Sequence, residues 1–158
     1  MTSAEQWNSS CEVRSYTPGE YAYFVEMYDN FKPKGMFQGM PPRAKNIRDK
    51  WINTLIENGE NFLAWLEGQV IGHVAILPDF DKRDAEYLIF VSQKSRGRGV
   101  GKDLTRMAIE KAKALDLKQV WLTVDAYNFR GIKLYRRFGF EFREEHGSAS
   151  ERTMLLNL

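Results

Sequence analysis

The sequence contains a single cysteine, Cys11, and only two histidines, His73 and His146. One thiol cannot build an intramolecular disulfide framework, which excludes the class of small disulfide-stapled domains. So few cysteines and histidines also argue against a zinc site of the usual kind. We therefore expect a protein that binds no metal.

Long apolar runs and a strong charge of one sign are also missing. No stretch approaches the roughly 18 apolar residues that a membrane-spanning helix needs. Residues 1–10 are polar and lack the apolar core of a signal peptide. The formal net charge of +2 is too small to predict a nucleic-acid partner. These absences predict a cytoplasmic protein with neither a membrane nor a nucleic-acid partner.

What the sequence does contain is typical of a globular domain. It has 158 residues, of which 43% are hydrophobic and 28% are charged. This is the length of one domain and is enough to bury a core. No internal repeat, low-complexity segment or long linker divides the chain. We expect a loose N-terminal leader over residues 1–10 and a single domain over residues 11–158.

Hydrophobic periodicity and turn residues predict an alternation of strands and helices. Strands are expected at residues 11–16, 62–66, 70–77, 85–91, 119–125, 140–145 and 151–157. Helices are expected at residues 17–30, 43–58, 101–115 and 128–138. The order is β-α-α-β-β-β-α-β-α-β-β, which predicts an α/β domain with a mixed sheet.

Local signals support two of these helices and one loop. Thr17 and Glu20 have the spacing of a capping box at the start of the first helix. Prolines and glycines break regular structure over residues 31–42, which predicts a loop. In the second helix, apolar residues at helical spacing predict the buried face, which consists of Ile47, Trp51 and Leu55.

A glycine-rich turn carries the strongest functional signal. The segment Arg96-Gly97-Arg98-Gly99-Val100-Gly101 stands between a predicted strand and a predicted helix. Glycine permits positive φ and lets a ligand approach the backbone closely. Successive amides in such a turn can point at one anion, and the N-terminus of the following helix adds further N–H groups. The turn is therefore a candidate site for a diphosphate.

Three phosphate-binding patterns compete for this turn. A Walker loop fails because Arg96 stands in place of its first glycine and Asp103 in place of its hydroxyl residue. A Rossmann fingerprint fails because Lys102 stands where its last glycine should be. The third pattern, Arg/Gln-x-x-Gly-x-Gly/Ala, fits Arg96, Gly99 and Gly101. With this pattern the turn resembles the acyl-CoA loop of the GNAT superfamily of N-acetyltransferases, although an ordinary strand-to-helix turn is the alternative.

A second segment resembles the same superfamily at the expected distance. The strand ending at Asp125 is followed by Asn128, by a short helix with Leu134-Tyr135, and by Gly139-Phe140. Family members often have alanine where this chain has Gly131, a change that costs a helix about 1 kcal/mol. The resemblance covers nearly the whole chain. It implies a mixed, mostly antiparallel sheet of about seven strands with about four helices.

The resemblance also implies an activity. The chain is expected to be an acyltransferase that moves an acetyl group from acetyl-CoA to a primary amine by direct attack, without a covalent enzyme intermediate. Tyr135 would donate a proton to the CoA sulfur, or else only pack its helix on the sheet. Glu86 would be the base, acting directly or through a water relay, or else only a solvent-facing charge at the start of a strand. His73 is a weaker alternative base.

The family further implies how acetyl-CoA is held. The backbone near Ile89, Phe90 and Val91 would pair with pantetheine, and the Val91 amide could donate to the oxyanion. Asn128 would contact the cofactor and could cap its helix at the same time. The diphosphate would be bound by the turn and by the basic side chains around it: Arg96, Gly97, Arg98, Gly99, Val100, Gly101 and Lys102.

The acceptor amine is expected on the other side of the thioester. In the family, the first two helices and the loop at 31–42 line this side. Met36, Phe37 and Met40 would form an apolar lid, or else simply pack the loop. The acceptor is a small-molecule amine or a protein amine, and a homodimer is common in the family. The alternative function is a non-catalytic domain that binds or senses acyl-CoA.

Overall fold

The computed structural model describes residues 11–34, 40–147 and 150–158 of the chain. The predicted leader therefore lies outside the described residues, as do Met36 and Phe37. The elements follow one another as β1 (Cys11–Ser15), η1 (Pro18–Glu20), α2 (Tyr21–Asn30), α3 (Lys45–Asn58), β2 (Glu60–Leu66), β3 (Gln69–Asp79), β4 (Asp84–Val91), η2 (Gln93–Ser95), α4 (Val100–Ala114), β5 (Gln119–Asp125), α5 (Phe129–Arg137), β6 (Glu141–Gly147) and β7 (Glu151–Asn157). The predicted order of strands and helices is confirmed, with two short 3₁₀ turns added.

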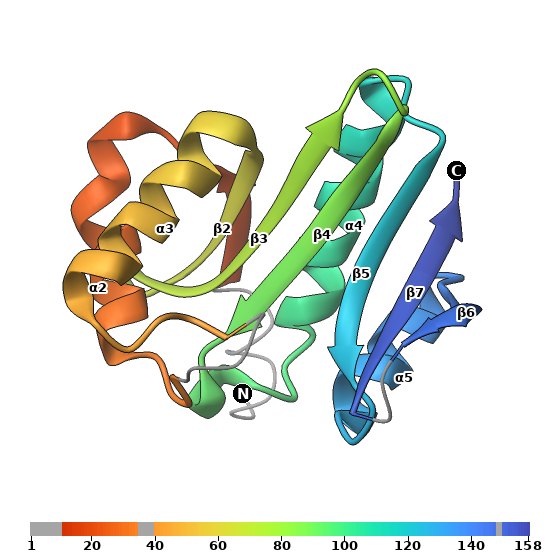
Figure 1. Cartoon of the computed structure of the whole chain (residues 1–158). Helices are drawn as coiled ribbons and strands as arrows, with labels where there is room; N and C mark the ends of the chain where they lie inside the picture. The colour runs from red at the N-terminus through yellow and green to blue at the C-terminus, as the bar shows by residue number, and fades with distance from the viewer. Residues whose placement is uncertain (1–10, 35–39, 148–149) are drawn as a thin grey trace, which may run out of the picture.

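The strands form one sheet in the order β1-β2-β3-β4-β5-β7-β6. Every neighbouring pair is antiparallel except β4 and β5, which run parallel. The β4–β5 ladder joins residues 84–86 to residues 119–121 and then stops. Figure 1 shows the two strands diverging below this ladder. The prediction of a mixed, mostly antiparallel sheet is confirmed, and the sheet is split in its middle.

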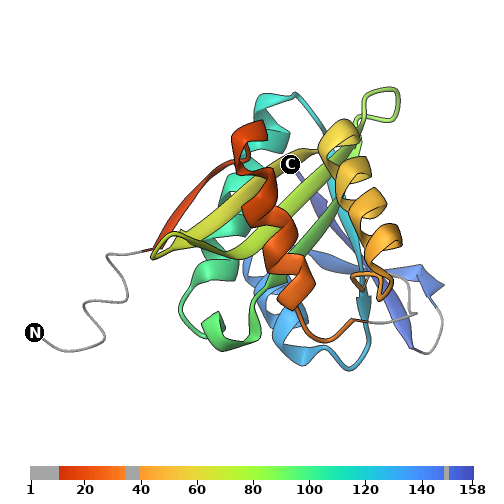
Figure 2. The ribbon, with the colours of Figure 1, turned by 90° about the vertical axis from the view of Figure 1, so that its left-hand side faces the viewer.

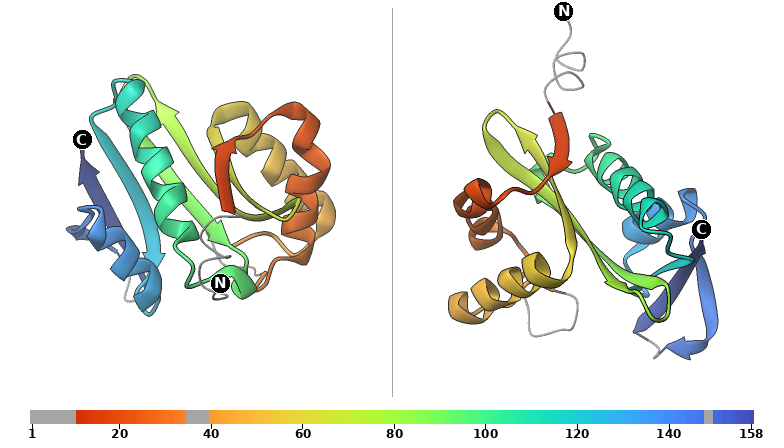
Figure 3. Two further views of the ribbon diagram at one scale, coloured as in Figure 1. Left: turned by 180° about the vertical axis from the view of Figure 1, so that it is seen from behind. Right: turned by 90° about the horizontal axis from the view of Figure 1, so that it is seen from above.

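Helices cover both faces of the sheet. Helices α2 and α3 lie over one face, in front of the sheet in Figure 2, and α4 and α5 lie over the other (Figure 3). Each layer encloses its own apolar cluster, the larger one under α4 and α5. A Cβ on Gly72 of β3 would lie 2.9 Å from a Leu104 methyl carbon and 3.2 Å from one of Val100. Gly72 thus allows α4 to pack directly on the middle of the sheet.

The first helical segment begins as its sequence predicts. Oε1 of Glu20 accepts the N–H of Thr17 at 3.0 Å, which is half of the expected capping box. The prediction for the second helix, α3, is confirmed for Leu55, which is buried, and wrong for Ile47, which is 55% exposed; Arg48 is buried instead. Arg48 tolerates burial because its guanidinium pairs with Asp29 at 2.6 Å. The buried residues of α3 are therefore Arg48, Ile52 and Leu55, a face that overlaps the one that apolar spacing predicts and is displaced from it by less than one residue.

Candidate functional site

The split between β4 and β5 leaves one edge of β4 without a partner strand. The N–H of Ser92 donates to the Ile71 carbonyl of β3 at 2.8 Å. Antiparallel alternation therefore directs the backbone groups of Phe90 toward β3 and those of Ile89 and Val91 toward the split. Beyond the ladder with β5, no strand of the described segments pairs with this edge. The edge can accept an extended ligand as an additional strand.

The glycine-rich turn lies at the open end of the split. Gly97 and Gly99 have φ values of +81° and +79°, and a Cβ on either would meet nothing within 4 Å. Both positions therefore favour glycine because of backbone conformation and not because of crowding. The Gly99 carbonyl accepts the N–H of Asp103 at 3.1 Å, so Gly99 is the N-cap of α4. The first amides of a helix have no partner within it and suit an anion.

Two buried side chains flank the exposed part of the glycine-rich turn. Ser95 and Val100 are 3% and 2% exposed. The basic side chains between and after them, Arg96, Arg98 and Lys102, are exposed. The turn thus presents backbone and positive charge on its outer side, as a site for phosphate groups requires.

Tyr135 lies on α5 beneath the split. Its ring is 8% exposed and meets the rings of Tyr87 and Phe140 at 5.7 and 6.0 Å. Burial raises the pKa of Tyr135 to about 12, so its hydroxyl keeps its proton at neutral pH. The neighbouring Leu134 has a methyl carbon 3.2 Å from the position of a Cβ on Gly101. This contact sets α5 against the first turn of α4.

Glu86 stands at the last pair of the β4–β5 ladder, opposite Trp121. Strand alternation turns it away from Tyr87 and toward the face covered by α2 and α3. The side chain is partly buried, and burial raises its pKa above the usual value for a glutamate. Glu86 and Tyr135 therefore border the split from opposite faces of the sheet.

His73, the alternative base, lies in the core with both ring nitrogens hydrogen-bonded. It is fully buried, and burial lowers its pKa to about 3. Its Nδ1 lies 2.6 Å from the Tyr28 hydroxyl, and its Nε2 lies 2.7 Å from Oδ1 of Asn61. With Tyr28 donating to Nδ1, the neutral ring donates from Nε2 to Asn61. Since both ring nitrogens are paired, His73 joins α2 to the sheet.

Asn128 caps α5 as predicted, because its Oδ1 accepts the N–H of Gly131 at 3.0 Å. A Cβ on Gly131 would lie 2.7 Å from Nδ2 of Asn128. The glycine that departs from the family pattern therefore leaves room for this cap. The cost in helix propensity is offset by a satisfied N-terminus.

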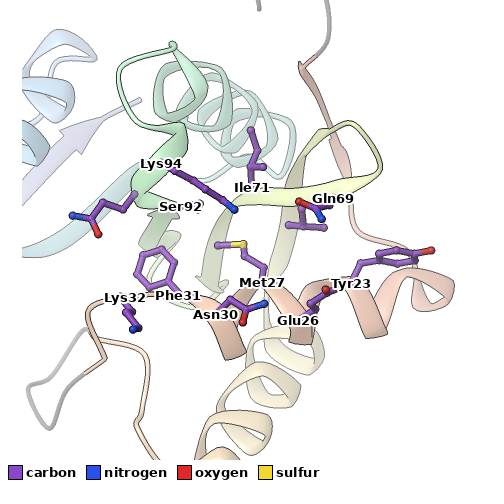
Figure 4. A pocket seen from close by; sticks show the side chains of 12 residues that line it. Tyr23, Glu26, Met27, Asn30, Phe31, Lys32, Gln69, Ile71, Ser92 and Lys94 are labelled. Carbon is purple, nitrogen blue, oxygen red and sulfur yellow. The ribbon is translucent and has the colours of Figure 1, made fainter.

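A cavity of about 500 Å³ opens between α2, the start of β3 and η2. Figure 4 shows Met27 and Phe31 on one side, Ile71 on another and the Lys94 side chain reaching across. Phe31 also packs on Phe90, with ring centroids 5.6 Å apart. Sequence analysis missed this cavity, because its walls come from segments far apart in the chain.

Of the predicted lid residues, Met40 is partly buried, and the other two lie outside the described residues. Within the described segments, no three side chains of histidine, cysteine, aspartate or glutamate are placed to hold a metal ion together. No helix in the same part of the chain is both long and apolar enough to cross a membrane.

Comparison with known proteins decides the family. The model of the acetyltransferase (GNAT) family matches residues 6–140. This chain is a member of the GNAT family. An uncharacterized N-acetyltransferase of Methanocaldococcus jannaschii is 31% identical over 140 residues, which are 84% of this chain and 61% of that protein. This GNAT chain therefore spans about three fifths of the length of that relative.

Two further comparisons concern an amine-acetylating relative and the fold. The spermine/spermidine N(1)-acetyltransferase of Bacillus subtilis is 26% identical over 102 residues, 60% of this chain and 67% of that enzyme. A GNAT phosphinothricin acetyltransferase of Sinorhizobium meliloti, solved in complex with acetyl-CoA, superposes with a TM-score of 0.75 at 21% identity. That match covers 94% of this chain and 89% of the other, and it confirms the GNAT fold.

Proposed function

We propose that this GNAT protein is an acetyl-CoA-dependent N-acetyltransferase that transfers an acetyl group to a primary amine by direct attack. The observation that carries the proposal is the split sheet. At the split, the open edge of β4, the glycine-rich N-terminus of α4 and the α5 helix bearing Tyr135 lie together. The acetylation of an amine by the Bacillus subtilis relative supports this activity.

The donor site follows from the backbone. Amides of residues 97–101 bind the diphosphate, and Arg96, Arg98 and Lys102 add charge-assisted contacts to it. The backbones of Ile89 and Val91 pair with the pantetheine arm, because they face the split.

Two other predicted donor-site residues have different tasks in this proposal. Phe90 contributes its ring to the wall below α2, since its backbone is committed to β3. Asn128 contacts the cofactor through its amide nitrogen, because its oxygen already caps α5.

The proposed chemistry needs one base, one oxyanion donor and one acid. Acetyl-CoA supplies an activated thioester. Glu86 accepts a proton from the amine, whose pKa near 10.4 would otherwise keep it protonated and unreactive. The Val91 amide stabilises the negative charge that develops on the carbonyl oxygen. As the tetrahedral intermediate collapses, the nitrogen loses its second proton to water and Tyr135 protonates the departing sulfur. Solvent then returns a proton to Tyr135, so the amide and free CoA form without a covalent enzyme intermediate.

We place the acceptor on the α2–α3 face, the face toward which Glu86 points. The acceptor class, a small-molecule amine or a protein amine, is part of this proposal. The cytoplasmic location and the homodimer stay predictions.

Thermal unfolding with and without acetyl-CoA tests the donor site. Acetyl-CoA at 100 times its dissociation constant should raise the free energy of unfolding by about 2.7 kcal/mol. Release of free thiol from acetyl-CoA across a panel of polyamines, amino acids, aminoglycosides and peptides tests the transfer. Stabilisation without thiol release would favour the acyl-CoA-sensing alternative. The absence of any stabilisation would contradict both functions.

A further inference from the structure

Strand β1 forms an open edge of the sheet. It stands first in the strand order and pairs with β2, and no other strand of the described segments pairs with it. Figure 2 shows β1 along the border of the sheet. An open edge presents unpaired N–H and C=O groups, to which a further strand can add. The residues of β1 determine which strand that would be.

The register of β1 on β2 shows which of its backbone groups face outward. The N–H of Tyr16 donates to the Asn61 carbonyl at 2.9 Å, and these two residues continue the β1–β2 register. Hydrogen-bonded residues alternate along an antiparallel strand, so the backbone groups of Glu12 and Arg14 bond to β2. The remaining residues of β1 direct their backbone groups away from the sheet, and they are Cys11, Val13 and Ser15.

A second copy of the same strand complements these outward groups. When two β1 strands run antiparallel about a twofold axis at Val13, Val13 pairs with Val13 of the second copy and Cys11 pairs with Ser15. These are the residues with outward backbone groups, so every one of them exchanges hydrogen bonds across the axis. The pairing is isologous and uses the β1 edges of both copies, so it closes at two.

Charge selects this register over its neighbours. Glu12 and Arg14 take the positions between the hydrogen-bonded pairs, where opposing side chains approach most closely. With the axis at Val13, Glu12 of each copy lies opposite Arg14 of the other. A shift of two residues in either direction would place Glu12 opposite Glu12, or Arg14 opposite Arg14. Like charges in these positions destabilise strand pairing, so the edge is self-complementary in one register.

The Arg14 side chain is already held in position for this contact. Its guanidinium lies 4.6 Å from the centroid of the Trp65 ring, and its Nη2 bonds to Glu20 at 2.8 Å. Its Nη1 bonds at 2.9 Å to Glu12 of the same chain, a side chain that is 67% exposed. Arg14 can therefore exchange this exposed carboxylate for Glu12 of a second copy while it keeps its contacts with Trp65 and Glu20.

We propose that two copies of this chain associate through their β1 edges into a dimer with one continuous sheet. The pairing also covers Cys11 and Val13, which are only partly buried at the margin of the larger apolar cluster. A strand of five residues from each copy makes a small interface, so the dimer is weak and depends on concentration. The split lies beyond β4, on the far side of β2 and β3, so the inference does not depend on the proposed function.

The oligomeric state of the whole chain tests the inference. Analytical ultracentrifugation over a concentration series should show a monomer–dimer equilibrium for the wild type. Val13→Pro removes an outward N–H and leaves the hydrogen bonds between β1 and β2 in place. Two hydrogen bonds are lost at the axis, so the dissociation constant should rise on the order of 30-fold. Val13→Thr keeps the N–H and the branched shape, and as the matched control it should dimerise like the wild type.

Two charge substitutions test the register itself. Glu12→Arg and Arg14→Glu each place like charges opposite one another twice, so each variant alone should raise the dissociation constant about tenfold. Mixed in equal amounts, the two variants should form a mixed dimer. One variant then carries only basic and the other only acidic side chains at the two facing positions, so both contacts become attractive.

Three results would overturn the inference. The first is a wild type that stays monomeric at every concentration. The second is a dimer that Val13→Pro does not weaken, because the contact would then lie elsewhere. The third is a mixture of the charge variants that contains no mixed dimer. Thermal unfolding shows whether Val13→Pro is folded, and if it is not, the wild type and the charge variants decide.

Discussion

Replacing Tyr135 with phenylalanine removes one oxygen atom and retains the ring that packs on Tyr87 and Phe140. A positioned general acid typically contributes a factor of roughly 10² to 10⁴ to the rate. We therefore expect turnover of Tyr135→Phe to fall by roughly that factor. The affinity for acetyl-CoA should change little, because the proposed donor contacts come from β4 and α4. Free-thiol release measures turnover, and thermal shift measures binding.

The same variant has a pH signature in stability. The pKa of Tyr135 is raised from 10 in the unfolded chain to about 12 in the fold, because burial disfavours the tyrosinate. A raised pKa contributes stability that is complete below the unfolded value and is lost as the pH rises through the folded value. Phenylalanine does not titrate. Relative to the variant, the wild type should lose up to about 3 kcal/mol in free energy of unfolding over this interval.

A neighbouring tyrosine provides the control for both measurements. Tyr87 is also buried, and its hydroxyl lies 2.7 Å from that of Thr105 and not in the proposed reaction path. Tyr87→Phe should cost about 1 kcal/mol of stability and leave turnover intact. Wild-type turnover in Tyr135→Phe would refute the general-acid role. An equal loss of turnover in both variants would show that packing beneath the split is responsible.

Three further substitutions test the base, the glycine-rich turn and the buried histidine. Glu86→Gln should abolish most activity near neutral pH and remove the acidic limb of the pH–rate profile; wild-type activity should fall as pH drops through the raised pKa of Glu86. An unchanged profile would contradict the base. Gly99→Ala should lower the free energy of unfolding by about 1 kcal/mol, because φ at Gly99 is +79° and a Cβ disfavours this conformation. The same strain in the glycine-rich turn should weaken CoA binding. Gly19→Ala, with equally open space and no positive φ, is its control in urea unfolding. His73→Leu should lower the free energy of unfolding by about 2–4 kcal/mol, because the buried polar groups of Tyr28 and Asn61 lose their hydrogen-bond partner. The pH–rate profile should stay unchanged, and a shifted profile would make His73 part of the proton path.

Much of the fold could be predicted because its signals are local. Alternation over residues 119–125 predicts β5 with the bounds that the structure has. The glycine-rich turn predicts the start of α4 to within one residue, since only a few conformations join glycines to a helix N-terminus. Asn128 predicts the cap of α5, because an asparagine side chain can accept a hydrogen bond from an amide three residues later. These elements are determined by residues close together in sequence.

The features that sequence analysis missed depend on distant partners. Nothing within α3 shows that Arg48 is buried, because its partner Asp29 lies on another helix. The burial of Arg48 therefore depends on an ion pair that apolar spacing does not reveal. The cavity beside Met27 is likewise formed by three elements brought together only in the fold. One local signal was present: Gly72 within a strand indicates a close approach, which the structure shows to be that of α4.

The end of the β4–β5 ladder is the feature on which the proposed mechanism depends most. Glu86 and Tyr87 are adjacent in β4, so they project from opposite faces, and Tyr135 lies on the face of Tyr87. In a continuous sheet, a base and an acid placed in this way would be separated by a layer of backbone. Because pairing stops at Glu86 and Trp121, a thioester lying in the split can be approached by the amine from one face and protonated from the other. In the proposed mechanism, the opening in the sheet thus serves both as the binding site for pantetheine and as the passage that brings the two proton-transfer groups to one reacting centre.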